Sequence, residues 1–119
     1  LHATLALIAL GGLAVMQGDD DRGAALLMEA LTAARGVEDR RLACILAGRV
    51  SINLAVAPRA NGQHALAAAH LEEALRLFRD AAFGEGMILA LGDLGNLARD
   101  RGDDVRALTL YREALDLGS

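Results

Sequence analysis

The chain has 119 residues, which is the length of about one domain. Hydrophobic residues make up 54% of it but aromatic residues only 3%, so Ala and Leu supply most of the apolar surface. This composition favours closely packed helices over a β-sandwich. The formal net charge of −4 gives no basic footprint for phosphates, so we expect no direct contact with nucleic acid.

Apolar side chains recur at helical spacing along the chain and predict six helices. Their expected ranges are Ala3–Gln17, Asp20–Arg35, Asp39–Ala57, Gln63–Ala81, Glu85–Arg101 and Asp104–Leu117. Gly36, the segment 58–62 and the pair Phe83-Gly84 act as breakers between them. Pro58 predicts that the third helix ends or kinks about one turn earlier than its equivalents, because proline lacks a backbone donor.

The first predicted helix is apolar on every side. Residues 3–16 carry no charge and resemble a signal-peptide core, but no basic leader precedes them and they are too few for the roughly 20 residues that span a bilayer. We therefore expect no membrane association. Such a helix needs burial on two sides, so Leu5, Ile8 and Leu13 are expected to meet a preceding repeat, a partner subunit or a second copy. Because the chain opens at Leu1 rather than Met, we expect it to be a fragment of a longer protein.

An internal repeat becomes visible when the chain is shifted by 84 residues against itself. The shift places residues 10–14 on 94–98, 18–20 on 102–104 and 29–31 on 113–115. A fainter copy lies between them, and its Glu73 is 44 residues after Glu29 and 40 before Glu113. Each unit therefore reads as one helical hairpin, in which Gly18 or its equivalent ends the first helix and Asp19 or Asp20 caps the second.

The third copy carries a recognisable signature, formed by Leu94-Gly95, Ala98, Gly102, Ala107, Tyr111 and Ala114-Leu115. This pattern resembles the tetratricopeptide repeat (TPR), which the third copy matches closely, the first well and the second weakly. The resemblance implies an all-α fold: an α-solenoid of three TPR-like hairpins, with about six antiparallel helices in a right-handed superhelix. The hairpins would span about residues 3–35, 39–81 and 85–117 of a single domain, 1–119.

Two longer phrases, at residues 70–79 and 94–103, resemble the repeats of large bacterial ATP-binding transcriptional regulators, among them LuxR-type regulators. In those regulators such arrays form a sensor or scaffold region beside an ATPase and a DNA-binding domain. The resemblance therefore implies a cytoplasmic segment that serves transcription regulation.

Few polar residues are placed for catalysis or metal binding. His64 and His70 are six residues apart on one predicted helix and point to different faces, unlike the i, i+4 pairs of helical metal sites. Cys44 lies in an apolar run, which favours a packed hydrophobe over a nucleophile. The acidic run at residues 19–21 lacks the further ligands of a calcium loop and suits helix capping. We expect no enzymatic activity, no metal and no cofactor; an enzyme using Cys44 or the histidines is the alternative from another class.

The resemblance implies that the first helix of each hairpin lines a concave binding surface. The polar residues expected there are Arg49, Asn53, Asp93, Asn96 and Asp100. Arg49 and Asn53 are one turn apart and are spaced to hold a carboxylate or the backbone of an extended peptide. The family's carboxylate clamp uses several Lys, Arg and Asn, whereas the first copy offers only Leu5, Ala9 and Gly12. The alternative is that all five are ordinary solvated polar residues.

These observations predict a non-enzymatic protein-protein interaction module that binds a protein, a peptide or a small effector. A structural scaffold or self-association domain without a groove ligand is the competing interpretation.

Overall fold

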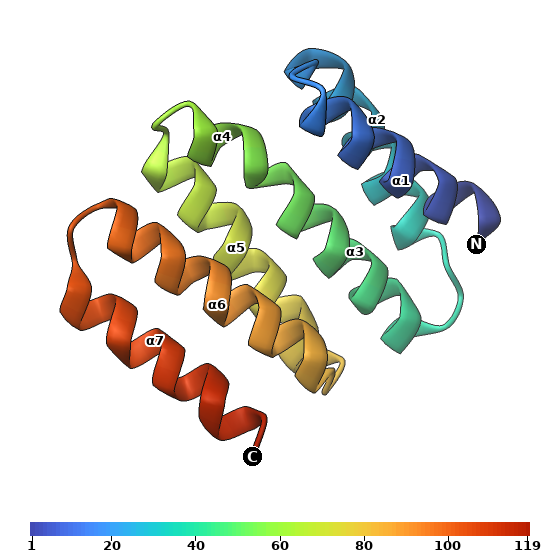
Figure 1. The fold of residues 1–119 in the computed structure, drawn as a ribbon. Coiled ribbons are helices and arrows are strands. Elements are labelled where there is room, and N and C mark those ends of the chain that lie inside the picture. The colour runs from blue at the N-terminus through green and yellow to red at the C-terminus, as the bar shows by residue number, and fades with distance from the viewer.

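The computed structural model describes all 119 residues and consists of helices and the turns between them (Figure 1). The helices are α1 (His2–Met16), α2 (Asp20–Arg35), α3 (Arg40–Leu54), α4 (Val56–Ala60), α5 (His64–Asp80), α6 (Gly84–Asp100) and α7 (Asp104–Leu117). Only Ala55 separates α3 from α4, so the two together take the place of one long helix. The predicted all-α solenoid of three helical hairpins is confirmed.

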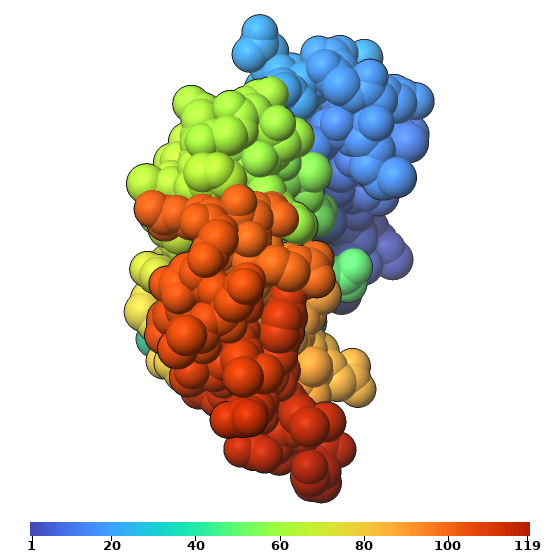
Figure 2. Space-filling model, turned by 60° about the vertical axis from the view of Figure 1, so that its left-hand side comes forward, coloured from blue at the N-terminus to red at the C-terminus, as the bar shows by residue number.

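Each hairpin packs on the next in chain order. Within the hairpins α1 packs on α2, α3 on α5 and α6 on α7, and between them α2 packs on α3 and α5 on α6. Contacts of α3 with both α1 and α6 bring the first helices of the three hairpins together on one face. In Figure 2 the hairpins follow one another from the blue N-terminal end to the red C-terminal end of a body measuring 40 × 31 × 18 Å.

Small residues let the helices of each hairpin approach closely. A Cβ atom on Gly11 would lie 2.8 Å from the side chain of Leu27, and one on Gly95 would lie 2.6 Å from the ring of Tyr111. These two contacts occur at positions related by the shift of 84 residues, so Leu27 fills in the first hairpin the space that Tyr111 fills in the third. The Ala-rich, aromatic-poor composition is therefore explained by the close packing of the helices where they cross.

The three hairpin turns share one backbone conformation. Each contains a glycine with positive φ, at +81° for Gly18, +76° for Gly62 and +80° for Gly102. This left-handed conformation is open to glycine at little cost and ends the first helix. In the first and third hairpins the next residue caps the second helix: the carboxylate of Asp19 accepts from the amide of Arg22, and that of Asp103 from the amide of Arg106. The predicted turn and cap are confirmed there.

Pro58 interrupts the third predicted helix, as expected, but the helical path continues past it. Because proline cannot donate to the carbonyl of Leu54, α3 ends at that residue. Pro58 then becomes the third residue of α4, inside the first turn, where no backbone donor is required. The expected helix end at Ala57 and the assignment of all of 58–62 to a connection were therefore wrong, since α4 runs to Ala60.

Residues Arg40–Ala60, which contain α3 and α4, are long and apolar enough to cross a membrane, with a mean hydropathy of 1.3. In this structure they form the middle of the array and pack on α2 and α5. Length and composition alone do not separate a membrane span from such a core helix.

Candidate functional site

A hollow lies where the first helices of the second and third hairpins meet. It is bounded by α3 and α4 on one side and α6 on the other, with α5 beneath, and its volume is about 470 Å³. We call it the α4–α6 hollow and define it by six lining residues. They are the apolar Ile52, Val56 and Leu71 and the charged Arg59, Asp93 and Asp100.

An ion pair closes one end of the α4–α6 hollow and links two hairpins. Nε of Arg59, on α4, donates to Oδ2 of Asp100, the last residue of α6, over 2.7 Å. This hydrogen bond lowers the pKa of the Asp100 carboxyl and raises that of the Arg59 guanidinium. Both groups therefore stay charged at neutral pH, and the guanidinium is directed to Asp100.

Asp93 is the second carboxylate of the hollow and lies two turns earlier on α6. Its side chain is half-buried and forms no hydrogen bond or ion pair with another group of the chain. Burial raises the pKa of the Asp93 carboxyl, and the positive charge of Arg59 opposes this rise. The hollow thus contains a half-buried acidic group that receives no hydrogen bond from the chain, and its three charged residues add to one net negative charge.

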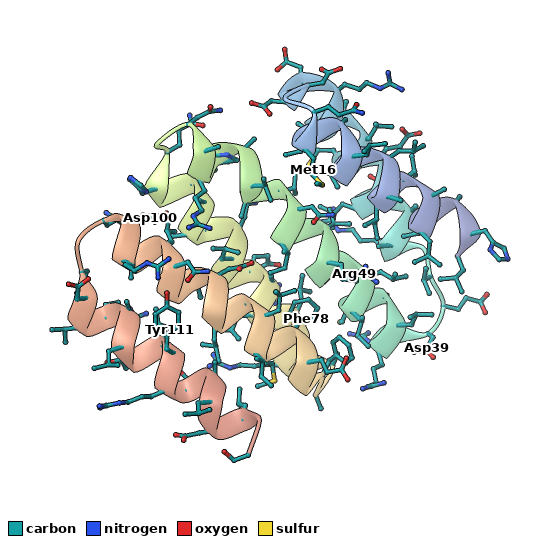
Figure 3. The ribbon with its side chains drawn as sticks, in the orientation of Figure 1. Met16, Asp39, Arg49, Phe78, Asp100 and Tyr111 are labelled. Carbon is teal, nitrogen blue, oxygen red and sulfur yellow. The ribbon has the colours of Figure 1, made fainter.

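Asn96 was expected in the same groove but is engaged elsewhere. Its side-chain oxygen accepts a hydrogen bond from the hydroxyl of Tyr111 on α7. Figure 3 shows Tyr111 reaching from α7 toward α6. The bond holds the third hairpin closed, so at least one polar atom of Asn96 is used inside the fold.

Arg49 and Asn53 do not line the α4–α6 hollow. Arg49 is exposed in the middle of α3, well separated from Asp100 in Figure 3. Asn53 is half-buried and faces α1, because a Cβ atom on Gly12 would lie 3.4 Å from its Nδ2. Of the five predicted groove residues, the structure brings only Asp93 and Asp100 together in this hollow.

Arg59 is the site residue that sequence reasoning missed. The helix was expected to end at Ala57, which left Arg59 in a connecting segment. The signal that could have found it is the tolerance of proline in the first turn of a helix, which allows a new helical turn to start just before Pro58.

Of the three residues predicted to form an association surface on α1, two are exposed and one is buried inside the hairpin. Leu5 is 42% exposed and Leu13 is 52% exposed, whereas Ile8 is buried at 5%. Ile8 belongs to the core shared with α2 and α3, so its inclusion in an association surface is corrected. Leu10 and Met16 extend the exposed apolar face instead.

The remaining reactive residues are scattered. Cys44 is a half-buried free thiol, and burial lowers the pKa of the His70 imidazole. Nδ1 of His64 is buried without a hydrogen-bond partner. No group of three or more His, Cys, Asp or Glu side chains is arranged to hold a metal ion.

Comparison with known proteins agrees with this architecture. The family model described as tetratricopeptide repeat matches residues 46–118, from α3 to the end of α7. No curated protein and no solved structure matches the chain. The match covers more than half of the sequence and includes every residue that defines the hollow, so the chain belongs to the tetratricopeptide repeat family.

Proposed function

We propose that the chain is a non-enzymatic module that binds an extended segment of a partner protein along the face formed by α1, α3 and α6. Tetratricopeptide repeats generally mediate protein-protein interaction, which supports the class of function. The α4–α6 hollow is the single observation that carries the location, because it combines an apolar floor with a charged rim on that face. Such a combination fixes a ligand by apolar contact and orients it by polar groups.

Selection from a library of random peptides displayed on phage, followed by calorimetric titration of the selected peptides, tests this proposal. Val56 lines the hollow and is 45% exposed, so Val56→Arg should block the hollow without opening the core. We expect at least a tenfold loss of affinity. Leu108→Arg is the matched control, because Leu108 is 49% exposed on α7, outside the hollow. Selected peptides that bind Val56→Arg as tightly as the parent chain would overturn the proposal.

The regulator context is a finer part of the same proposal. It is supported by the phrases at residues 70–79 and 94–103, and it assigns the array to the sensor or scaffold region of a cytoplasmic transcription regulator. Sequencing the gene on both sides of this segment tests it. A nucleotide-binding motif upstream or a helix-turn-helix downstream is expected, and flanks with neither would remove this part of the proposal.

Self-association is a second candidate function, favoured by the two ends of the array. Leu115 on α7 is 71% exposed, whereas its repeat equivalent Leu75 on α5 is 7% exposed and packed in the core. Leu13 on α1 is 52% exposed, whereas its equivalent Leu97 on α6 is 2% exposed. In this structure no neighbour covers Leu13 or Leu115. We propose that a second copy covers these positions, with α7 of one copy packed on α1 of the next.

Light scattering across a concentration series, with Leu13→Glu and Leu115→Glu, tests this head-to-tail packing. The parent chain should grow in mass with concentration, and each variant alone should stay monomeric. An equimolar mixture should form dimers only, because one intact α7 meets one intact α1. A parent chain that is monomeric at all concentrations, or variants that still associate alone, would overturn this candidate.

A further inference from the structure

The α4–α6 hollow offers an acidic group to whatever enters it. Arg59 is directed to Asp100 over 2.7 Å, which satisfies one carboxylate and the guanidinium together. Asp93 receives no hydrogen bond from the chain and is half-buried beside the apolar Ile52 and Leu71. A carboxylate in such a place is costly until a donor of opposite charge reaches it.

We propose that the α4–α6 hollow is a subsite for one arginine or lysine side chain of the bound protein segment, whose cationic head pairs with Asp93. This proposal rests on the proposed function and names the ligand chemistry of its central site. The aliphatic stem of that side chain would lie against Ile52, Val56 and Leu71. Long cationic side chains bury their stems on apolar surface while the head stays polar, which is the arrangement that this hollow provides.

The charges of the hollow disfavour the binding of acidic and aliphatic side chains. An acidic side chain would meet both Asp93 and Asp100, while Arg59, the one basic residue that lines the hollow, is already paired with Asp100. An aliphatic side chain would remove water from Asp93 without offering a hydrogen bond, which costs free energy. A cationic side chain pairs with the Asp93 carboxylate and also neutralises the net charge of the hollow. Of the three kinds of side chain, it is therefore the only one whose binding is favoured by both effects.

The charged residues of the α4–α6 hollow are not repeated at the equivalent positions of the junction between the first and second hairpins. The repeat relationship places Ala9 and Asn53 at the positions of Asp93, and Met16 and Ala60 at those of Asp100. Val15 stands where Arg59 stands in the second hairpin. None of these residues carries a charge, so the equivalent positions do not reproduce the pairing of Arg59, Asp93 and Asp100.

The test uses fragments that imitate single side chains, so that it does not depend on finding the partner. The probes are n-butylguanidinium, its neutral analogue n-butylurea and the anion valerate, titrated into the isotope-labelled chain and followed by NMR. We expect n-butylguanidinium to shift the amide signals of Ile52, Asp93 and Asp100, with at least tenfold weaker binding of n-butylurea and none of valerate. The cation should also lower the pKa of the Asp93 carboxyl, measured from its carboxyl carbon signal.

Asp93→Asn should reduce binding of n-butylguanidinium to the level of n-butylurea. Asp116→Asn is the matched control, because it removes the same charge from an exposed position on α7. Equal binding of the charged and neutral probes, no shift at the highest soluble concentration, or equal effects of the two variants would overturn the proposal. The outcome is separate from that of the phage selection. Selected peptides without a basic residue overturn the subsite alone, whereas a failed selection beside specific fragment binding overturns the proposed function alone.

Discussion

The ring of Phe78 occupies the space in which a Cβ atom on Gly86 would lie, with ring carbons 2.5 Å from that position. Phe78 belongs to α5 and is 1% exposed, whereas Gly86 belongs to the first helix of the next hairpin. The same ring lies 2.5 Å from the Cβ position of Gly48 on α3. One aromatic side chain thus packs against two successive hairpins, and two glycines make room for it.

Gly86→Ala should lower the free energy of unfolding by about 1–3 kcal/mol, because the added methyl group meets a buried ring that cannot move aside. Gly92→Ala in the same helix is the control, since nothing lies within 4 Å of its Cβ position. There, alanine should stabilise the helix by about 0.5–1 kcal/mol. Urea unfolding followed by circular dichroism measures both. Effects of the same sign would contradict the packing explanation.

Most of the fold could be predicted because each repeat carries both its apolar stripe and its turn. Gly18 and Gly102 stand at equivalent places and adopt the same left-handed conformation, and the aspartate after each caps the next helix. These are local interactions, which sequence spacing describes well. The path around Pro58 was less predictable, because proline allows two outcomes, an ended helix or a restarted one.

The hollow was only partly predictable, for a geometric reason. The family resemblance implies that Asp93 and Asp100 lie on the concave side of the array, and both line the α4–α6 hollow. Whether Arg59 or Arg49 of the preceding hairpin reaches them depends on how far the two hairpins are shifted along their axes. That shift is set by side-chain packing between hairpins, including the Phe78 contact. The spacing of residues within one helix does not indicate it.

Ala82 is the one residue other than glycine with a positive φ, at +51°, and Ala82→Gly should stabilise the chain. The left-handed conformation destabilises the folded chain by about 1–2 kcal/mol when the residue is alanine. Glycine removes this strain but lowers the free energy of unfolding by about 0.4–1 kcal/mol, because its unfolded state has more conformational freedom. The net gain should be about 0.5–1 kcal/mol. Ala69→Gly, at an exposed position inside α5, is the control and should lose about 1 kcal/mol. Thermal unfolding measures both variants. An equal change of stability in the two would contradict the explanation that Ala82 is strained.

Arg41→Met should destabilise the second hairpin. Nε of Arg41, in the first turn of α3, donates over 2.8 Å to the carbonyl of Ala81, the residue directly after α5. Loss of this bond should cost about 1 kcal/mol. Arg40→Met removes the same charge from the neighbouring residue, whose side chain makes no hydrogen bond, and should cost less. Denaturant unfolding of the two variants compares them, and equal losses would show that the bond contributes nothing.

Asp93 and Asp100 should respond to pH in opposite senses, although both lie on α6. The pKa of Asp93 is raised, so the folded chain holds that proton more tightly than the unfolded chain. The free energy of unfolding therefore falls as pH rises from the unfolded-state pKa of 3.8 through the raised pKa of the folded chain. The ionised Asp93 carboxylate destabilises the fold at neutral pH. The pKa of Asp100 is lowered by Arg59, so its contribution is present above 3.8 and is lost as pH falls through the lowered value.

Asp93→Asn should accordingly raise the free energy of unfolding at pH 7, and this gain should shrink as pH falls and vanish below about 3.8. Asp100→Asn should lower the free energy of unfolding at pH 7, and its deficit should disappear only in stronger acid. Urea unfolding of the parent chain and both variants at a series of pH values measures the two curves. If Asp93→Asn destabilised the chain at neutral pH, Asp93 would have a partner that satisfies its charge, and the α4–α6 hollow would have no need of an external cation.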